Sequence, residues 1–310
     1  MVNSKGYFPK LIKDLKVQKY LLVLVLPAMV WLFIFWYLPL IGVVSAFQNY
    51  NVGLGFFQSK WVGLKYFIEI FTDSLMLNSL RNTIMYSLLN LAVGFPVPII
   101  FALMLNELNG MFKFKRTVQT VSYMPYFLSW AFVASFLISF FAGNGLFNEL
   151  LKACGIQTNN YAYMAKPLSF IAIIVGSSLW KGYGISSIMY IAVMSTINLE
   201  LYDAAMIDGA NRWQKIRYIT LPGIKTTVVV LLILSISSIV NSNFEQFYLL
   251  SNSLVADTSR VIDVYTYKVG IQMGRFSYGT AVGLFKSLMS LMLLVIANAT
   301  SRKVVGESIY

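Results

Sequence analysis

Residues 201–222 read LYDAAMIDGANRWQKIRYITLP, a charged segment of helical pattern that lies between two long apolar runs. Ala205 and Gly209 are four residues apart, so they share one face of a helix and allow a second backbone to come close. Gly209 also permits a sharp change of direction, because it has no Cβ. After it, apolar side chains recur every three residues from Trp213 to Ile219. The segment therefore predicts two short helices with a bend between them.

The second of these helices carries Arg212, Lys215 and Arg217. It is expected to stop at Leu221-Pro222, because proline cannot continue a helix. A segment that only links two apolar runs does not need to be polar and helix-forming. We therefore expect it to lie at the membrane surface and to be held by a soluble partner.

The remainder of the chain predicts an all-α, polytopic membrane protein. Of its 310 residues, 58% are hydrophobic and 12% are charged, whereas an ordinary soluble domain carries roughly a quarter charged residues. The apolar runs are unbroken, which argues against a β-barrel, whose strands alternate polar and apolar residues. Six runs have the length of a membrane span. They are expected near residues 20–47, 80–105, 118–141, 168–196, 226–250 and 279–301.

Basic residues predict the orientation, because cytoplasmic loops carry an excess of lysine and arginine. They gather in the N-terminal tail, in residues 106–117 and 197–225, and after the last span, and they are fewer in the alternate loops. Both termini and the 201–222 segment are therefore expected in the cytoplasm.

The chain divides into a short basic segment, one membrane domain and a tail. Residues 1–19 have an amphipathic pattern, so they either lie in the headgroup layer or form a solvated tail that only fixes orientation. Residues 20–303 are expected to form one six-span domain, and residues 304–310 a cytoplasmic tail.

Composition argues against several kinds of site. The net charge of +12 is explained by topology, and no clustered basic patch predicts nucleic-acid binding. The chain has no histidine, which removes the commonest general base and metal ligand. Its one cysteine, Cys154, has no partner for a disulfide or a metal site. We therefore predict no catalytic and no metal-binding residues.

The charged segment resembles the EAA loop of permease subunits of binding-protein-dependent ABC importers. The similarity lies in Asp203-Ala-Ala, Asp208-Gly-Ala and the closing Ile219-Thr-Leu-Pro. The family usually has glutamate where this chain has Asp203, so a contact made there would have to be closer. The ATPase-coupling residues implied by the resemblance are Asp203, Ala204, Ala205, Asp208, Gly209, Ala210, Trp213, Ile219, Leu221 and Pro222.

Further short segments are similar to the carbohydrate-uptake, maltose-type branch of these permeases. They are residues 105–107, 124–125, 145–148 and 180–181. The lysine-rich N-terminus and the first span, as far as Tyr50, look most like the first permease subunit of complex-oligosaccharide importers.

The resemblance implies a type I ABC importer permease fold and a bacterial cell (inner) membrane. A second, homologous permease subunit completes the pore in this family, and an extracellular substrate-binding protein delivers the sugar. Two ATPase subunits dock on the EAA loops and move them as levers that switch the pore between inward-open and outward-open. This chain has no G-x-x-x-x-G-K-[ST] stretch that would cradle phosphates. ATP and Mg are therefore expected on the partner subunits, and no cofactor is expected in this chain.

Polar residues inside the spans are candidates for the substrate pathway. Each could instead make a structural hydrogen bond between helices. Sugars need amides, carboxylates and aromatic rings, so the stretch from Asn241 to Tyr248 is the first choice. Lys286 in the last span could snorkel to the interface or pair with Glu245. The candidate pathway residues are Asn90, Lys181, Tyr183, Asn241, Asn243, Glu245, Gln246 and Tyr248.

Three other functions remain as alternatives. The same EAA loop occurs in permeases for non-sugar solutes. A membrane enzyme would need paired carboxylates or a nucleophile with a base, and the absence of histidine together with only 12 acidic residues argues against it. An ion-coupled secondary transporter often has internal inverted repeats, and none is evident between residues 20–141 and 168–301.

Overall fold

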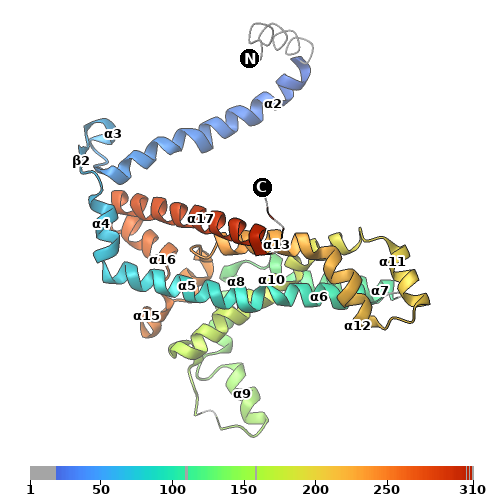
Figure 1. The fold of residues 1–310 in the computed structure, drawn as a ribbon. Coiled ribbons are helices and arrows are strands. Elements are labelled where there is room, and N and C mark those ends of the chain that lie inside the picture. The colour runs from blue at the N-terminus through green and yellow to red at the C-terminus, as the bar shows by residue number, and fades with distance from the viewer. Residues whose placement is uncertain (1–18, 109–110, 158, 305, 307, 309–310) are drawn as a thin grey trace, which may run out of the picture.

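The computed structural model describes residues 19–108, 111–157, 159–304, 306 and 308, and it is built almost wholly of helices (Figure 1). Five helical segments are long and apolar enough to cross a membrane. They are Lys19–Phe47, Ser74–Asn106, Pro167–Met194, Arg212–Ser237 and Phe276–Lys303. A sixth span is a bent pair, Phe112–Phe127 with Trp130–Phe140. The predicted number of six holds if this pair is counted once.

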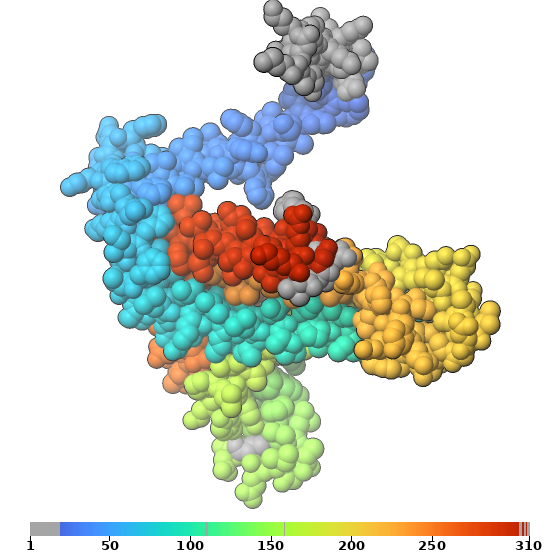
Figure 2. All heavy atoms as spheres, in the orientation of Figure 1, coloured from blue at the N-terminus to red at the C-terminus, as the bar shows by residue number. Residues whose placement is uncertain are grey.

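The N-terminal part of the first span stands apart from the other helices, whereas its last residues pack against the last span, where Ser45 bonds Thr280 at 3.1 Å (Figures 1 and 2). The first span joins α2 (Lys19–Leu32), a π-helical turn (Phe33–Tyr37) and a 3₁₀ helix (Leu38–Phe47). None of the side chains of α2 is buried. The predicted basic segment before it lies outside the described residues, apart from Lys19, as does most of the 304–310 tail.

Short elements follow at one end of the bundle. Strands β1 (Gln48–Asn49) and β2 (Lys60–Trp61) form an antiparallel pair in which Gln48 is opposite Trp61. Helix α3 (Gly55–Gln58) lies between the strands, and α4 (Lys65–Thr72) follows them. The carboxylate of Asp73 then caps the next helix.

The second span consists of α5 (Ser74–Gly94) and α6 (Pro96–Asn106). Helix α6 begins at a proline, where the missing N–H costs little. Helix α10 (Pro167–Met194) packs along it, and near one end Ala102, Tyr190, Met194 and Ile224 form a buried cluster.

The third span is not the straight helix that residues 118–141 predict. Helix α7 (Phe112–Tyr123) passes into a 3₁₀ turn (Met124–Phe127), and α8 (Trp130–Phe140) leaves it at 92°. Leu128 and Ser129 are extended, and the Ser129 hydroxyl accepts the N–H of Phe132 at 3.3 Å to begin α8. The chain bends here because Pro125 and this serine cap interrupt the apolar run.

Helix α9 (Leu146–Ala153) and a 3₁₀ turn (Tyr163–Ala165) lead from α8 to α10. The 201–222 segment follows α10 as α11 (Leu199–Ile207) and α12 (Arg212–Lys215). Both helices lie at the end of the bundle opposite α4 and α15 (Figure 1).

The predicted stop at Pro222 is wrong. Helix α12 continues through a π-helical turn (Ile216–Thr220) into α13 (Leu221–Ser237), and the whole segment Arg212–Ser237 is one helical span. The N–H of Leu221 donates to the carbonyl of Ile216, five residues back. A proline ring clashes with the carbonyl four residues back in a regular helix, and the wider turn before Pro222 accommodates it.

The predicted outer end of the same span, near residue 250, is also wrong. Helix α13 ends at Ser237, and α14 (Phe244–Leu250) is a separate helix after a non-helical link, residues 238–243. Asn243 caps α14 by accepting the N–H of Gln246 at 3.3 Å. Side chains of this kind compete with the helix for backbone hydrogen bonds, which explains the break.

The chain ends in a short helical segment and the last span. The elements are a 3₁₀ turn (Ser253–Val255), α15 (Ala256–Ser259), α16 (Ile262–Thr266), a π-helical turn (Tyr267–Gln272) and α17 (Phe276–Val304). Helices α16 and α17 pack on α4 and α5 around buried Ile70, Tyr265, Tyr278 and Val282.

Candidate functional site

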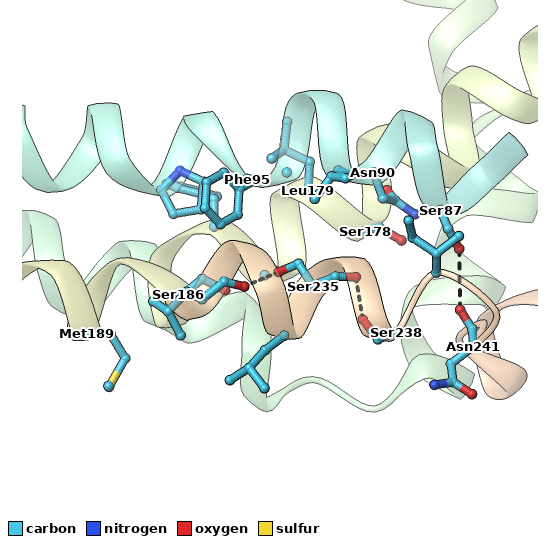
Figure 3. A pocket seen from close by; sticks show the side chains of 18 of the residues that line it. Ser87, Asn90, Phe95, Ser178, Leu179, Ser186, Met189, Ser235, Ser238 and Asn241 are labelled. Carbon is cyan, nitrogen blue, oxygen red and sulfur yellow. Dashed lines mark hydrogen bonds between the residues drawn. The ribbon is translucent and has the colours of Figure 1, made fainter. Parts of the chain in front are cut away.

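A cavity of about 650 Å³ lies between α5, α6, α10 and α13 (Figure 3). Helix α5 contributes Ser87 and Asn90, and Asn241 closes the cavity beside the end of α13. The Ser87 hydroxyl donates to the Asn241 carbonyl at 3.4 Å. The polar lining residues are Ser87, Asn90, Ser178, Tyr183, Ser186, Tyr190, Ser235, Ser238 and Asn241.

The described lining of the cavity mixes polar and apolar side chains and carries no charge. None of the described residues that line it is a lysine, arginine, aspartate or glutamate. Hydroxyl and amide groups both donate and accept hydrogen bonds. Apolar residues make up the rest of the wall, among them Leu91, Phe95, Met189 and Leu234. Such a lining suits a neutral or polyhydroxylated ligand better than a compact ion.

Three of the eight predicted pathway residues line this cavity, namely Asn90, Tyr183 and Asn241. The Tyr183 ring packs edge-on against Phe101, with the ring centroids 5.1 Å apart. The other five lie outside it, although four of them belong to the stretch that ranked first.

Lys181 holds the bend of the third span. Its side chain is buried, with 9% of the residue exposed. The ammonium donates to the carbonyls of Tyr126 at 2.6 Å and Leu128 at 2.5 Å. These are backbone groups that the break in the helix leaves without helical partners, and they must be satisfied inside the protein.

Gln246 joins α14 to α10. Its side-chain amide donates to the Ile174 carbonyl at 2.8 Å and to the Ser177 hydroxyl at 3.0 Å, and its oxygen accepts from Ser178 at 2.7 Å. Asn243 is the cap of the same helix.

The remaining two residues of the first-choice stretch lie on the other faces of α14. Glu245 is exposed. The ring of Tyr248 stacks on Phe244 at 5.2 Å and meets Tyr267 edge-on at 5.5 Å.

Asp263 and Lys286 form an ion pair beside the link 238–243. The Asp263 carboxylate also accepts the N–H of Ser242 at 2.8 Å and its hydroxyl at 2.6 Å. Of the two alternatives for Lys286, the pairing with Glu245 is therefore wrong. The carboxylate that Lys286 contacts sits on α16, outside the predicted spans.

The prediction from sequence did not include the serines that line the cavity. Ser178, Ser186, Ser235 and Ser238 lie within apolar runs, where a lone hydroxyl often bonds its own helix, as Ser235 does to the Leu231 carbonyl at 2.8 Å. The signal was their spacing. Positions 178, 182 and 186 are four apart on one face of α10, and all three line the cavity.

The 201–222 segment has the predicted bend. The φ angle of Gly209 is +77°, a left-handed conformation that favours glycine. The N–H of Ala210 donates to the Ala205 carbonyl at 2.8 Å, which closes α11. Asn211 and Gln214 then form a reciprocal capping box that begins α12.

Large apolar side chains of this segment are exposed. Ile207 has 88% and Trp213 has 68% of its surface exposed, and Met206 is exposed as well. The hydroxyls of Tyr202 and Thr220 lie 2.9 Å apart and hold α11 to the π-helical turn. Among the other predicted coupling residues Asp203, Ala204, Asp208 and Pro222 are exposed, and Ala205, Ala210, Ile219 and Leu221 are half-buried.

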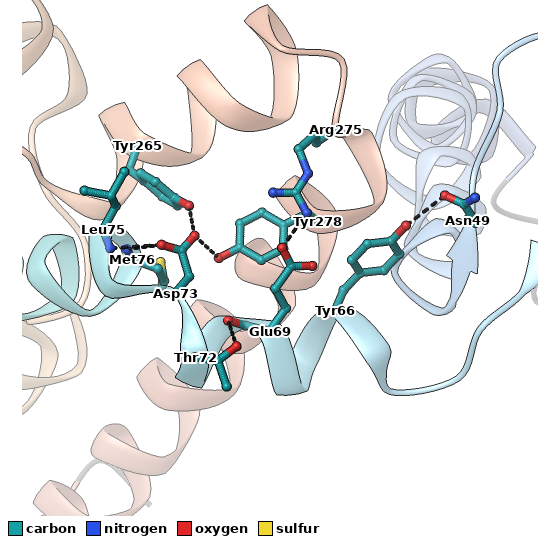
Figure 4. A network of polar contacts seen from close by, with 10 residues as sticks. All are labelled: Asn49, Tyr66, Glu69, Thr72, Asp73, Leu75, Met76, Tyr265, Arg275 and Tyr278. Carbon is teal, nitrogen blue, oxygen red and sulfur yellow. Dashed lines mark hydrogen bonds and ion pairs between the residues drawn. The ribbon is translucent and has the colours of Figure 1, made fainter.

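At the opposite end of the bundle, Asp73 is the centre of a polar network (Figure 4). Its carboxylate accepts hydrogen bonds from the hydroxyls of Tyr265 and Tyr278, and from the N–H groups of Leu75 and Met76. Burial by itself raises the pKa of Asp73, but these four hydrogen bonds together hold the pKa below its usual value. Beside it, Arg275 pairs with Glu69 at 2.5 Å.

Comparison with known proteins adds independent findings. Residues 67–306 match the family model described as "Binding-protein-dependent transport system inner membrane component". Protein LplB of Bacillus subtilis (strain 168) is 40% identical over 297 residues, which cover 96% of this chain and 92% of that protein. The polygalacturonan/rhamnogalacturonan transport system permease protein YteP of the same organism is 40% identical over 314 residues, covering 100% and 96%.

A solved structure has the same fold over nearly the whole chain. A chain in the crystal structure of a bacterial alginate ABC transporter, in complex with an alginate pentasaccharide-bound periplasmic protein, superposes with a TM-score of 0.86 at 34% identity. The match covers 96% of this chain and 99% of that chain.

Proposed function

The chain belongs to the family of binding-protein-dependent transport system inner membrane components, and we propose that it forms half of the pore through which an oligosaccharide is imported. The family assignment and the matching structure confirm the predicted type I ABC permease fold. They also confirm that the chain is a transport component rather than an enzyme.

The observation that carries the choice of substrate is the lining of the 650 Å³ cavity. Its hydroxyls and amides come from three spans, and no charged side chain lines it within the described residues. A saccharide presents many hydroxyl groups that need both donors and acceptors, and this cavity offers both. Relatives named for rhamnogalacturonan and alginate transport support the same substrate class.

The first span supports a second permease subunit. Helix α2 is apolar, and none of its side chains is buried against the described part of the chain. A homologous subunit packed beside it, with lipid on the remaining faces, would cover this surface. The pore then lies between the two subunits, and the cavity of this chain forms one wall.

The α11–α12 segment is proposed to bind the ATPase subunits, which carry ATP and Mg. Its exposed Ile207 and Trp213 are the kind of apolar side chains that anchor protein interfaces. The excess of basic residues on this side supports a cytoplasmic location, in a bacterium, for this segment and both termini. The substrate-binding protein then docks at the end that carries α4 and α15.

The continuous helix from Arg212 to Ser237 gives the coupling a direct route. ATPase movement applied at Trp213 on α12 reaches Ser235 at the cavity without crossing a loop. A helix of 26 residues is stiff along its axis, with a rise of about 1.5 Å per residue. The π-helical turn before Pro222 is the one place in it where the direction can adjust.

Uptake by the reconstituted importer tests this proposal. The chain is assembled with a second permease and ATPases in liposomes, with ATP inside and the binding protein and labelled oligosaccharide outside. Uptake is expected to require both ATP and the binding protein. Ser235→Leu places a larger side chain in the cavity. It should lower uptake at least about tenfold, because it obstructs the path of the substrate. Ser287→Leu, an exposed serine on α17 that also bonds its own helix, is the matched control.

An ion-coupled carrier gives the opposite result. Its uptake would persist without ATP and collapse with the ion gradient. Unchanged uptake in Ser235→Leu, with normal assembly, would show that the substrate does not pass through this cavity.

A further inference from the structure

A second cavity, of about 300 Å³, lies between the end of α14 and the start of the π-helical turn at Tyr267. Arg260 and Lys268 line it together with serine hydroxyls and Asn252, and no acidic residue is among its described lining. It shares no lining residue with the 650 Å³ cavity. Helices α15 and α16, which contribute to its lining, lie at the end of the bundle opposite α11 and α12 (Figure 1).

The cations of this cavity are incompletely paired. The Nη1 atom of Arg260 is buried and has no hydrogen-bond acceptor among the described residues. The nearest carboxylate, that of Asp257, is 3.7 Å away and its side chain is 87% exposed. Lys268 is exposed, and the described part of the chain offers its ammonium no ion-pair partner. A buried donor without an acceptor is costly, so the cavity favours an incoming anion.

The segment that carries Arg260 is held rigidly. The side-chain amide of Asn82 on α5 donates to the carbonyls of Asp257 at 2.6 Å and Arg260 at 2.9 Å. The N–H of Ile262 donates to the Thr83 hydroxyl at 2.9 Å. These bonds fix the backbone on both sides of the guanidinium before any partner arrives, which lowers the entropy lost on binding.

We propose that this cavity receives a carboxylate side chain of the substrate-binding protein when that protein docks, an inference that rests on the proposed function. A guanidinium with a neighbouring ammonium is a preferred receptor for a carboxylate. The carboxylate belongs to a protein rather than to the sugar, because a group bound here lies off the neutral cavity through which the sugar passes. Leu254, 73% exposed and next in the chain to the lining residue Ser253, supplies an apolar contact to the same partner.

The test measures the affinity of the full importer, in lipid nanodiscs, for its labelled binding protein at several salt concentrations. Arg260→Gln should weaken binding about 30-fold, the loss typical of removing one member of a buried charge pair. Lys268→Gln should weaken it about threefold and reduce the salt dependence, because this cation is exposed. Lys60→Gln is the matched control, since Lys60 is an exposed cation of β2 at the same end. It should change the affinity by about twofold or less.

Changing single acids of the binding protein to amides identifies the carboxylate. For the correct acid the effects of the two changes, Arg260→Gln and the amide, are not additive. Arg260→Lys keeps the charge and should recover part of the affinity. If Arg260→Gln fails to assemble, Lys268→Glu decides, because Lys268 is exposed and the charge reversal must still weaken docking.

Two outcomes overturn the inference. In one, the variants bind as tightly as the wild type or lose no more than Lys60→Gln does. In the other, docking is unchanged but uptake of uronate-containing sugars alone falls, which makes the cavity a substrate site. The proposed function fails separately, if the wild-type importer neither binds a binding protein nor takes up sugar with ATP.

Discussion

The two ends of the span Arg212–Ser237 contradict the sequence in opposite ways. At the end beside α11, Pro222 predicts a stop, yet the helix continues through a π-helical turn. At the other end an apolar run predicts continuation, yet the helix ends at Ser237 and the link 238–243 is not helical. A change in turn geometry accommodates a proline, whereas the break is held open by side chains that bond the backbone. The first end depends on helix geometry and the second on polar contacts from other helices.

The largest effect is expected from Asp263→Ala, which removes the contacts that hold the break. The change deprives Ser242 of an acceptor and leaves the Lys286 ammonium, largely buried, without its carboxylate. Losing one member of such a pair lowers the free energy of unfolding by about 3 kcal/mol. Thermal unfolding of the detergent-solubilised complex measures it.

The double variant Asp263→Ala/Lys286→Met is the control for this reading. It removes the uncompensated charge and should recover much of the lost stability. Equal melting temperatures for the single and double variants would mean that the ion pair does not hold the link.

The next effect concerns the bend at Gly209. A Cβ at this position would meet no atom within 4 Å, so Gly209→Ala tests the backbone conformation alone. The left-handed φ of +77° costs a non-glycine residue about 1–2 kcal/mol. ATP-driven uptake should fall several-fold while the cavity is unchanged. Gly283→Ala, at another open position in α17 but without a positive φ, should leave uptake as it is. Wild-type uptake in Gly209→Ala would mean that the bend is not needed for coupling.

The end of the bundle that carries Asp73 should lose stability in acid. The Asp73 network holds the pKa of this carboxyl below its unfolded value of 3.8, so its contribution to stability is present above pH 3.8. The contribution is lost as the pH falls through the lower, folded pKa, because the protonated form no longer accepts all four bonds. Asp73→Asn should therefore be less stable at neutral pH and show a shallower loss of melting temperature in acid. Identical acid profiles for the two proteins would exclude Asp73 as a source.

The sequence could predict the features that depend on neighbouring residues, but not those that depend on contacts from distant parts of the chain. The apolar runs located five spans, and the glycine in the charged segment located the bend at Gly209, because both features depend on local sequence. The bend in the third span has local causes in Pro125 and Ser129, but the role of Lys181 in holding it depends on a contact between residues more than 50 positions apart. The carboxylate for Lys286 lay in a segment outside the predicted spans. In the candidate cavity, Asn90 and Asn241 could be selected as polar groups in apolar runs, but Gln246 carries the same amide group and uses it to pack α14 on α10. Residue type alone does not separate these roles.

The smallest effect is expected from Pro222→Ala, and it decides whether the first end is set by geometry. Alanine restores an N–H and a strong helix former at a position where the helix is already continuous. If the π-helical turn exists only to accommodate the proline ring, the turn can relax to a regular helix, and stability should change by no more than about 0.5 kcal/mol. The turn between Trp213 and Ser235 would then lose its wide geometry, and α12 would rotate relative to the cavity. Uptake per ATP hydrolysed measures this rotation, because it is sensitive to how α12 is oriented against the ATPases. A drop in that ratio with unchanged stability would show that the π-helical turn sets the orientation of α12 against the ATPases. An unchanged ratio would show that only the continuity of the helix Arg212–Ser237 matters for coupling.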